Sequence, residues 1–186
     1  MNGVGENLSA TPIQVFATFI ATTAGVGLIP LAPGTFGSLV GVALFWLVSS
    51  LGLPFYLPFL FVFSLLGVWA SGMAEVFFEK SDDGRIVIDE VVGQLVVLTP
   101  LVPLRGEELP ALGSLDAFFL LTVTGFVAFR VFDIWKPGVV GWTEKNLSGG
   151  VGVMADDLVA GVLGALVVAL PAGLLLYSAA ARGAAT

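Results

Sequence analysis

The chain has 186 residues, of which 57% are hydrophobic and only 11% are charged, and its formal net charge is -7. A soluble domain keeps about a quarter of its residues charged because its surface must face water, so this composition predicts an integral membrane protein. The chain has no cysteine, so it cannot form a disulfide or a thiolate site. It also has no histidine, so no imidazole can act as a base or bind a metal. The acidic balance disfavours nucleic acid as a partner.

The first apolar segment, residues 11–29, carries polar side chains at helical spacing: Thr11, Gln14, Thr18 and Thr22. Such a helix can lie in the membrane interface, enter and leave the membrane on one side, or span it with its polar stripe facing other helices. The sequence does not choose among these placements. We expect the segment to remain in the protein, because it lacks the basic region and cleavage site of a signal peptide.

The second segment, residues 36–51, begins within the stretch PLAPGTFGSLVG, residues 30–41. Pro33 suits the start of a helix. Backbone amides after Gly34, with the hydroxyls of Thr35 and Ser38 as caps, would form a helix N-terminus that attracts an anion such as phosphate. This stretch therefore predicts a phosphate-binding helix start.

The same stretch has a second interpretation, which is close helix packing. Gly37 and Gly41 form a GxxxG pair that allows the backbones of two helices to approach. Phosphate binding and packing use different faces of the helix, so both interpretations can hold.

Two more spans are predicted at residues 55–78 and 86–104, since a spanning helix needs roughly 20 apolar residues. The second begins with RIVIDEVVGQLVVL, which contains Asp89 and Glu90. A charged side chain inside a membrane segment costs about 2.5–3.5 kcal/mol, so these acids need a partner or a watery site. They lie only roughly 6–8 Å inside the helix start. We therefore expect them to face a cleft at the membrane surface.

The segment predicted at residues 115–135 ends in FRVFDIWKP, where Arg130, Asp133 and Lys136 recur every three residues and Pro137 stops the helix. A cation, an acid and a second cation near one helical face can hold a phosphate beside a metal. A plain salt bridge at the membrane surface is the alternative.

The last span, residues 154–178, follows a glycine-rich loop and opens with a second acid pair, Asp156 and Asp157. Neighbours on a helix point about 100° apart, so one member of each pair can bind a ligand while the other supports it. Interfacial acids paired with nearby cations are the simpler alternative for any single residue. In a chain without histidine or cysteine, clustered carboxylates indicate Mg²⁺, which binds carboxylates, waters and substrate phosphate.

Counting crossings puts the loops at 79–86 and 136–153 on one side of the membrane, and the loops at 52–57 and 105–114 on the other. The first side gathers nine of the fourteen acids: Glu75, Glu79, Asp82, Asp83, Asp89, Glu90, Asp133, Asp156 and Asp157. It also gathers most of the cations: Lys80, Arg85, Arg130, Lys136 and Lys145, against Arg105 and Arg182 opposite. By the positive-inside rule this side is cytoplasmic.

These segments predict an all-α, polytopic membrane bundle of five to six helices, with residues 11–29 as the interfacial or re-entrant candidate. No repeat, linker or low-complexity tract divides the chain. We therefore predict one membrane-embedded domain over residues 1–186.

Four stretches, LIPLAPGTFGSL, DDGRIVIDEVVG, FRVFDIWKP and GGVGVMADDLVAG, closely resemble in order and spacing the motifs of the phosphatidylglycerophosphatase A family, from about Gly25 to Gly161. The resemblance implies a Mg²⁺-dependent phosphatase of the bacterial inner membrane with its active site facing the cytoplasm. It would hydrolyse phosphatidylglycerophosphate to phosphatidylglycerol and phosphate, a step of phospholipid biosynthesis. Family members carry a histidine near the position of Asp83 and a proline at the position of Val139, and the roles of those groups do not transfer.

The resemblance, taken with the residues above, gives three sets of site residues. The catalytic set is Asp89, Glu90, Asp133, Asp156 and Asp157. The metal ligands are Asp82, Asp89, Glu90, Asp156 and Asp157. The set that binds the substrate phosphate is Gly34, Thr35, Ser38, Arg130 and Lys136.

A transporter or channel for a cation or phosphate is the rival function. Such a protein is expected to carry acids near the membrane midplane or on both faces, whereas here they gather at one end. A CDP-alcohol phosphotransferase would also use acids and Mg²⁺, but its signature, D-x2-D-G-x2-A-R followed by G-x3-D-x3-D, is missing from this sequence.

Overall fold

A computed structural model describes residues 10–107, 111–112 and 115–183. The loop predicted at 105–114 is therefore described in part, and both ends of the predicted domain, residues 1–9 and 184–186, lie outside the described residues. The α-helices are α1 Pro12–Ala21, α2 Pro33–Val48, α3 Leu53–Phe78, α4 Ile88–Leu98, α5 Ala117–Trp135, α6 Val139–Asn146 and α7 Gly149–Gly183. Short 3-10 helices are η1 Val26–Leu28, η2 Ser49–Leu51 and η3 Thr99–Leu104, and strands β1 Ala111–Leu112 and β2 Leu115–Asp116 pair antiparallel.

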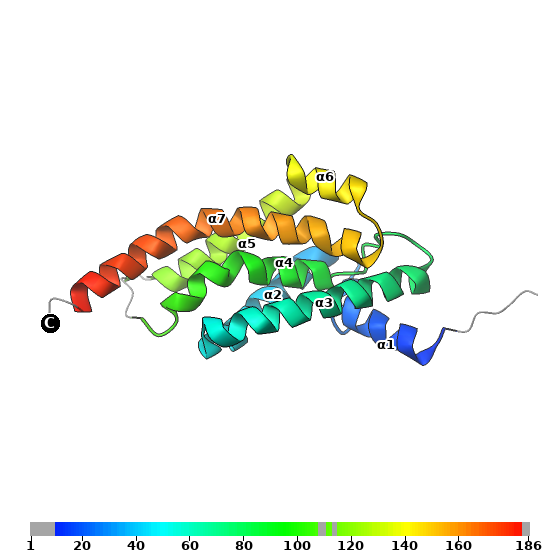
Figure 1. Cartoon of the computed structure of the whole chain (residues 1–186), viewed down its shortest axis with the longest axis horizontal. Helices are drawn as coiled ribbons and strands as arrows, with labels where there is room; N and C mark the ends of the chain where they lie inside the picture. The colour runs from blue at the N-terminus through cyan, green and yellow to red at the C-terminus, as the bar shows by residue number, and fades with distance from the viewer. Residues whose placement is uncertain (1–9, 108–110, 113–114, 184–186) are drawn as a thin grey trace, which may run out of the picture.

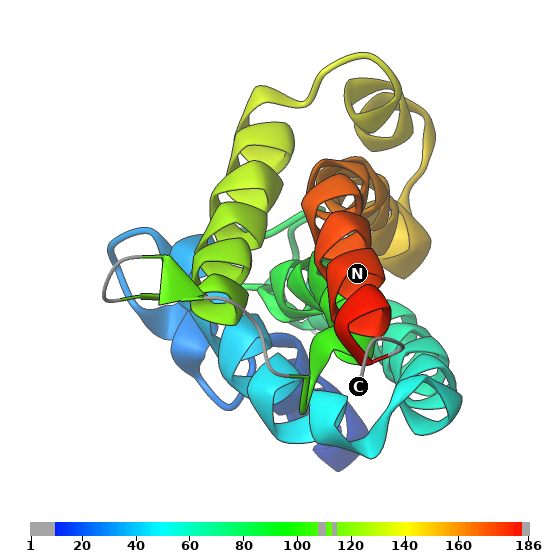
Figure 2. The same cartoon turned by 90° about the vertical axis from the view of Figure 1, so that its left-hand side faces the viewer.

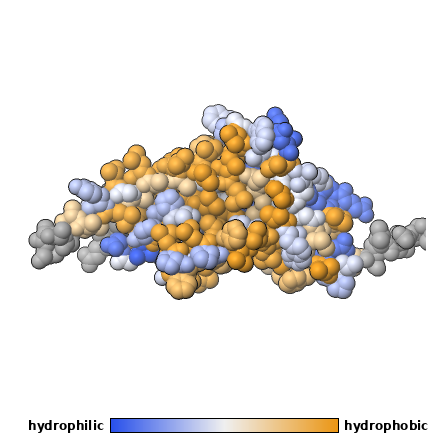
Figure 3. Space-filling view, viewed as in Figure 1, coloured by the Kyte–Doolittle hydropathy of each residue, from blue (hydrophilic) through white to orange (hydrophobic). Residues whose placement is uncertain are grey.

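Four helices, α2, α3, α5 and α7, are long and apolar enough to cross a membrane. They correspond to the spans predicted at 36–51, 55–78, 115–135 and 154–178. Their outer faces carry large exposed apolar side chains, such as Leu47, Phe61, Val127 and Leu170. In Figure 3 the middle of the visible surface is mostly apolar, and hydrophilic residues gather toward the ends. The predicted helical bundle is therefore confirmed, with four helices that could span a membrane.

The span predicted at residues 86–104 is not confirmed as a single long α-helix. The α-helix α4 has only 11 residues and passes into the 3-10 helix η3, which contains Pro100 and Pro103. Proline lacks the N–H that an α-helix needs. Most of α4 is buried, and in Figure 2 it lies in the middle of the other helices. Its apolar composition thus reflects contact with protein on all sides rather than with lipid.

For residues 11–29 the sequence left three placements open, and the spanning one does not fit the length of the helix in the structure. The helix α1 has 10 residues, about 15 Å, and it starts at a capping box formed by Thr11 and Gln14. Thr18 is buried on its inner side, while Phe16 and Phe19 are exposed. The helix packs against α3 at the end of the bundle drawn at the right in Figure 1. The interfacial and re-entrant placements are the two that fit this length.

Glycines bring the neighbouring helices close to α4. A Cβ atom at Gly41 in α2 would lie 2.8 Å from Cβ of Gln94, and one at Gly161 in α7 would lie 2.8 Å from the carbonyl oxygen of Gly93. Neither position has room for a larger side chain, because carbon atoms separate by about 3.5–4.0 Å at optimal contact. The packing interpretation of the Gly37 and Gly41 pair is therefore confirmed, and α4 is held between α2 and α7.

A hydrogen bond between α3 and α4 contributes to the stability of the fold, and a substitution that removes it tests this contribution. The hydroxyl of Tyr56, a fully buried side chain, donates to the carbonyl oxygen of Leu95 at 2.7 Å. We expect Tyr56→Phe to cost about 1 kcal/mol of unfolding free energy, which lowers the melting temperature by about 2–4 °C. Tyr177→Phe is the control, because Tyr177 is 76% exposed. Equal melting temperatures for both variants in detergent would contradict the prediction.

Candidate functional site

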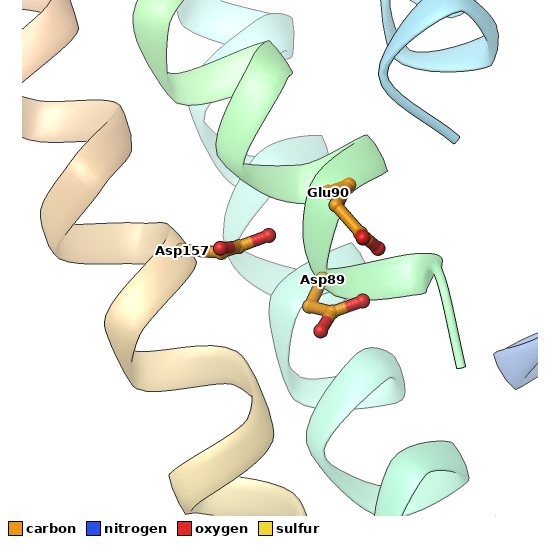
Figure 4. Close-up of side chains that lie close together, drawn as sticks. All are labelled: Asp89, Glu90 and Asp157. Atoms are coloured by element: carbon orange, nitrogen blue, oxygen red, sulfur yellow. The ribbon is translucent and has the colours of Figure 1, made fainter. Parts of the chain in front are cut away.

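Three carboxylates from two helices meet near the N-terminal end of α4. One oxygen from each of Asp89, Glu90 and Asp157 lies within 4.8 Å of the other two. In Figure 4 Asp157 extends from α7 toward the turn of α4 that carries the other two acids. Asp89 is 9% exposed and Asp157 is 3% exposed. We call these three residues the carboxylate trio.

The carboxylate trio has buried oxygen atoms without hydrogen-bond partners among the described residues: Asp89 Oδ1, Glu90 Oε2 and Asp157 Oδ2. Burying a carboxylate without a partner is costly, and like charges at this distance repel. A bound cation would remove both penalties. The donor set, three hard oxygens without nitrogen or sulfur, suits Mg²⁺ or a similar ion.

Gly34, in the first turn of α2, makes room for the carboxylate of Glu90. A Cβ atom at Gly34 would overlap that carboxylate and would lie 3.3 Å from Nη1 of Arg130. The first predicted motif therefore meets the second and the third at one point. The absence of a side chain at this position lets α2 approach the acids.

Arg130 links α5 to α2 beside the carboxylate trio. Its Nη1 forms an ion pair with Oδ2 of Asp133 at 2.6 Å and donates a hydrogen bond to Oγ of Ser38 at 3.3 Å. Arg130 and Asp133 are 17% and 13% exposed. The predicted salt bridge is present, and its cation also reaches the helix that carries Gly34.

The predicted helix caps on α2 are wrong. Ala32 is the N-cap residue, and the cap has no side-chain hydrogen bond. The hydroxyl of Ser38 instead donates to the carbonyl oxygen of Gly34 at 2.9 Å, and Thr35 is half-buried in the first turn of α2. Ser38 thus belongs to the site through Arg130 rather than through a capped helix start.

Lys136 connects three helices. It follows the last residue of α5 with a φ of 45°, and its Nζ lies 2.8 Å from Asp156 Oδ2 in α7 and 2.8 Å from Glu144 Oε1 in α6. Burial lowers the pKa of Lys136, but the hydrogen bonds with Asp156 and Glu144 outweigh this effect and raise the pKa above its usual range. Lys136 therefore keeps its positive charge and neutralises Asp156.

The two acid pairs differ in arrangement. Asp156 pairs with Lys136 while its neighbour Asp157 faces α4, so one acid of this pair lies in the carboxylate trio and the other does not. Asp89 and Glu90 both belong to the carboxylate trio. Both adjacent acids of α4 thus belong to the carboxylate trio, whereas only one of the two adjacent acids of α7 does.

Asp82, predicted as a metal ligand, lies outside the carboxylate trio. It is exposed, and its backbone N–H donates to Oε1 of Glu75 at 2.8 Å. With Glu75 and Asp156 it lines a small pocket of about 60 Å³. Asp82 is therefore a neighbour of Asp156 rather than of the three clustered carboxylates.

Asp83 has a structural partner of its own. Its Oδ1 lies 2.7 Å from Nε of Arg85, and hydrogen bonds from Arg85 lower the pKa of Asp83 to about 2. The guanidinium of Arg85 also lies 3.7 Å from the ring centre of Phe78. These contacts order the loop between α3 and α4, which leads into the first turn of α4.

Two residues near the site were missed in the sequence. Gln94 lies one turn after Glu90, is fully buried, and neither end of its amide finds a hydrogen-bond partner within the described ranges. Gln94 follows Glu90 by four residues in an apolar helix, and this spacing could have predicted that both side chains lie on the same face. Glu144, the exposed partner of Lys136 in α6, offered no comparable pattern.

The chain is similar to one known protein family and to several known proteins. Residues 19–172 match the sequence model of a family described as Phosphatidylglycerophosphatase A. Two relatives of that name come from Escherichia coli, 33% identical over 78% of this chain and 77% of its own length, and from Haemophilus influenzae, 36% identical over 80% and 84%. A third relative, from Bacteroides thetaiotaomicron, is described as a putative phosphatidylinositol-3-phosphatase and is 36% identical over 81% of this chain and 90% of its own.

No solved structure matches the chain. The matched range, residues 19–172, spans the positions of the carboxylate trio and of Gly34, Arg130 and Lys136. The resemblance found in the sequence motifs is therefore confirmed, and the chain belongs to the phosphatidylglycerophosphatase A family, a family of phosphatases that hydrolyse a phosphate monoester.

Proposed function

We propose that this protein is a Mg²⁺-dependent lipid phosphatase that hydrolyses phosphatidylglycerophosphate to phosphatidylglycerol and phosphate at the cytoplasmic face of the bacterial inner membrane. The observation that carries this proposal is the carboxylate trio beside the Arg130 and Ser38 contact. Anionic ligands for a metal and a cation for phosphate thus lie next to each other in a membrane bundle. The names of the relatives from Escherichia coli and Haemophilus influenzae support the substrate.

The ion would be held by Asp89, Glu90 and Asp157, whose clustered, unpartnered oxygens fit a hard divalent cation. Bound there, Mg²⁺ would supply the positive charge that polarises a phosphate group and lowers the pKa of water. Asp156 is the adjacent acid, and its pairing with Lys136 keeps its charge compensated next to the carboxylate trio.

The chain's own cations would bind the substrate phosphate. Arg130 presents a planar group of donors that matches two phosphate oxygens at once, and Asp133 holds that group in place. Lys136 adds a second positive charge at the same end of the bundle. Gly34 leaves the space in which the carboxylate of Glu90 and the guanidinium of Arg130 come together.

For the membrane arrangement we propose five crossings with α1 as an interfacial or re-entrant sixth element. Together α4 and η3 rise about 28 Å, close to the roughly 30 Å of a hydrocarbon core. The segment can therefore connect the two surfaces inside the bundle. Trp135 and Trp142 are 80% and 58% exposed near the end of the bundle that holds the site, as expected for an aromatic belt at a membrane surface.

Phosphate release in detergent tests this proposal. We expect release from phosphatidylglycerophosphate, loss of release in EDTA, and recovery when Mg²⁺ is added in excess. Phosphatidylinositol 3-phosphate serves as the comparison substrate because of the name of the Bacteroides relative. Full activity in EDTA would show that the enzyme does not need a metal ion. A clear preference for the inositol lipid would show that phosphatidylglycerophosphate is not its main substrate. Ion flux in liposomes without phosphate release would favour the transporter or channel instead.

A further inference from the structure

Arg130 belongs to two environments at once. Its guanidinium contacts Asp133 and Ser38 in the candidate site. Arg130 is also one of the residues that line a groove of about 480 Å³ on the outer surface of α5. The other residues that line this groove are apolar: Phe126, Val127, Val131, Ile134 and Trp135. We call it the α5 groove, and it joins the polar site to the apolar surface of the bundle.

The α5 groove extends along the helix from Trp135 toward the middle of the bundle. Residues 126–135 cover about 13 Å of helix, and Ile134 and Trp135, at the end near Lys136, are 71% and 80% exposed. The groove therefore begins at the level of the proposed membrane surface and continues inward on a face that lipid can reach.

Two comparable apolar grooves among the described residues contain no charged side chain. One of about 430 Å³ lies between α3, α4 and α7 and includes Leu65 and Leu158. The other, of about 460 Å³, lies between α5 and α7, includes Val167, and shares Val127 and Val131 with the α5 groove. A cation within the bilayer is costly unless it is paired or functional. Arg130 therefore distinguishes the α5 groove from these two as a place for a ligand with one anionic end and one apolar end.

We propose that the α5 groove holds an acyl chain of the lipid substrate while the phosphate of that lipid lies against Arg130. The inference rests on the proposed function as a lipid phosphatase. The substrate would then reach the carboxylates sideways from the bilayer, past α5, and its head group would not have to pass through the loops at the end of the bundle. Charge complementarity fixes the phosphate, and contact with Val127 and Val131 fixes the chain.

Tryptophan substitution tests the proposal by filling the groove. Val127→Trp is expected to lower kcat/KM for phosphatidylglycerophosphate in mixed micelles about tenfold, mainly through KM. The control is Val167→Trp in the uncharged groove between α5 and α7, which Val127 also lines, and it should stay within about twofold of wild type. Val127 and Val167 are both exposed, at 53% and 45%, so neither change introduces bulk into the core. Equal losses in both variants, or no loss in Val127→Trp, would overturn the proposal.

A photolabelling experiment gives an answer even if the wild type hydrolyses none of the lipids offered. The probe is phosphatidic acid with a diazirine in one acyl chain, incorporated with the protein into phosphatidylcholine nanodiscs. We expect adducts within residues 126–135 that excess unlabelled phosphatidic acid suppresses and that Val127→Trp reduces. Adducts spread equally over α3 and α5, or adducts that phosphatidic acid does not suppress, would mean that the groove binds bulk lipid only and would overturn the proposal.

Discussion

Asp89→Asn is expected to abolish phosphate release and, at the same time, to raise the thermal stability of the metal-free protein. Asp89 is buried, and one of its oxygens lies within 4.8 Å of oxygens from Glu90 and Asp157. Replacing it by a neutral side chain of the same size relieves repulsion among the acids. The same replacement removes one proposed ligand of the metal, so stability and activity change in opposite directions.

The expected size of each effect follows from its cause. A catalytic metal ion supplies several kcal/mol of transition-state stabilisation, and about 1.4 kcal/mol corresponds to a factor of ten in rate. We therefore expect turnover to fall by at least about 100-fold. In EDTA the melting temperature should rise by about 2–4 °C for each kcal/mol of relieved repulsion. Added Mg²⁺ should raise the melting temperature of the wild type but not that of the variant.

Asp83→Asn is the matched control, because Asp83 is also buried, at 5% exposure against 9% for Asp89, and precedes Asp89 in the same motif. Its partners are Arg85 and Lys80 rather than other acids. The pKa of Asp83 is lowered to about 2 in the folded protein, so its ion pair stabilises the fold above the unfolded pKa of about 3.9 and this contribution is lost as the pH falls toward 2. At neutral pH this variant should lose stability and keep its turnover. If Asp89→Asn instead keeps near-native turnover, the proposed role of the carboxylate trio is wrong.

Much of the fold was predictable from local signals. Long apolar windows identified α2, α3, α5 and α7, and Pro33 and Pro137 marked the start of α2 and the end of α5. The length of α4 was not predictable, because a helix surrounded by protein has the same apolar composition as one surrounded by lipid. Its burial depends on contacts with α2 and α7, which are distant in the sequence.

The sequence predicted that Asp89, Glu90 and Asp157 come together, but it did not predict how the other charged residues pair. The sequence brought the acids and cations to one end of the bundle, but the rotation of α7 decides that Asp156 meets Lys136 while Asp157 meets α4. Ser38 bonds back to Gly34 instead of capping the helix, because Ala32 occupies the N-cap position. Each difference arises from a tertiary contact that residue spacing along one helix does not contain.

Gly34→Ala is expected to lower turnover by about 100-fold in a protein that still folds. The added Cβ atom would overlap the carboxylate of Glu90, which is the free end of a flexible side chain, and its three nearest neighbours are all side-chain atoms of Glu90 and Arg130. Glu90 can therefore move aside, and alanine is a better helix former than glycine. A displacement of about 1 Å in a catalytic group is enough to cost about 100-fold in rate. Phosphate release at saturating Mg²⁺ measures the expected loss of turnover, and the melting temperature measures whether the variant still folds.

Gly84→Ala is the control for this prediction. Gly84 lies at the same end of the bundle, six residues before Glu90 in the sequence, and a Cβ atom there would have no neighbour within 4 Å among the described residues. Its turnover and its response to Mg²⁺ should equal those of the wild type. Wild-type turnover in Gly34→Ala would show that activity does not depend on the position of the Glu90 carboxylate. A loss of turnover in Gly34→Ala together with an unchanged response of the melting temperature to Mg²⁺ would instead assign the contact to phosphate binding by Arg130, because the same Cβ atom would lie 3.3 Å from Nη1 of that residue.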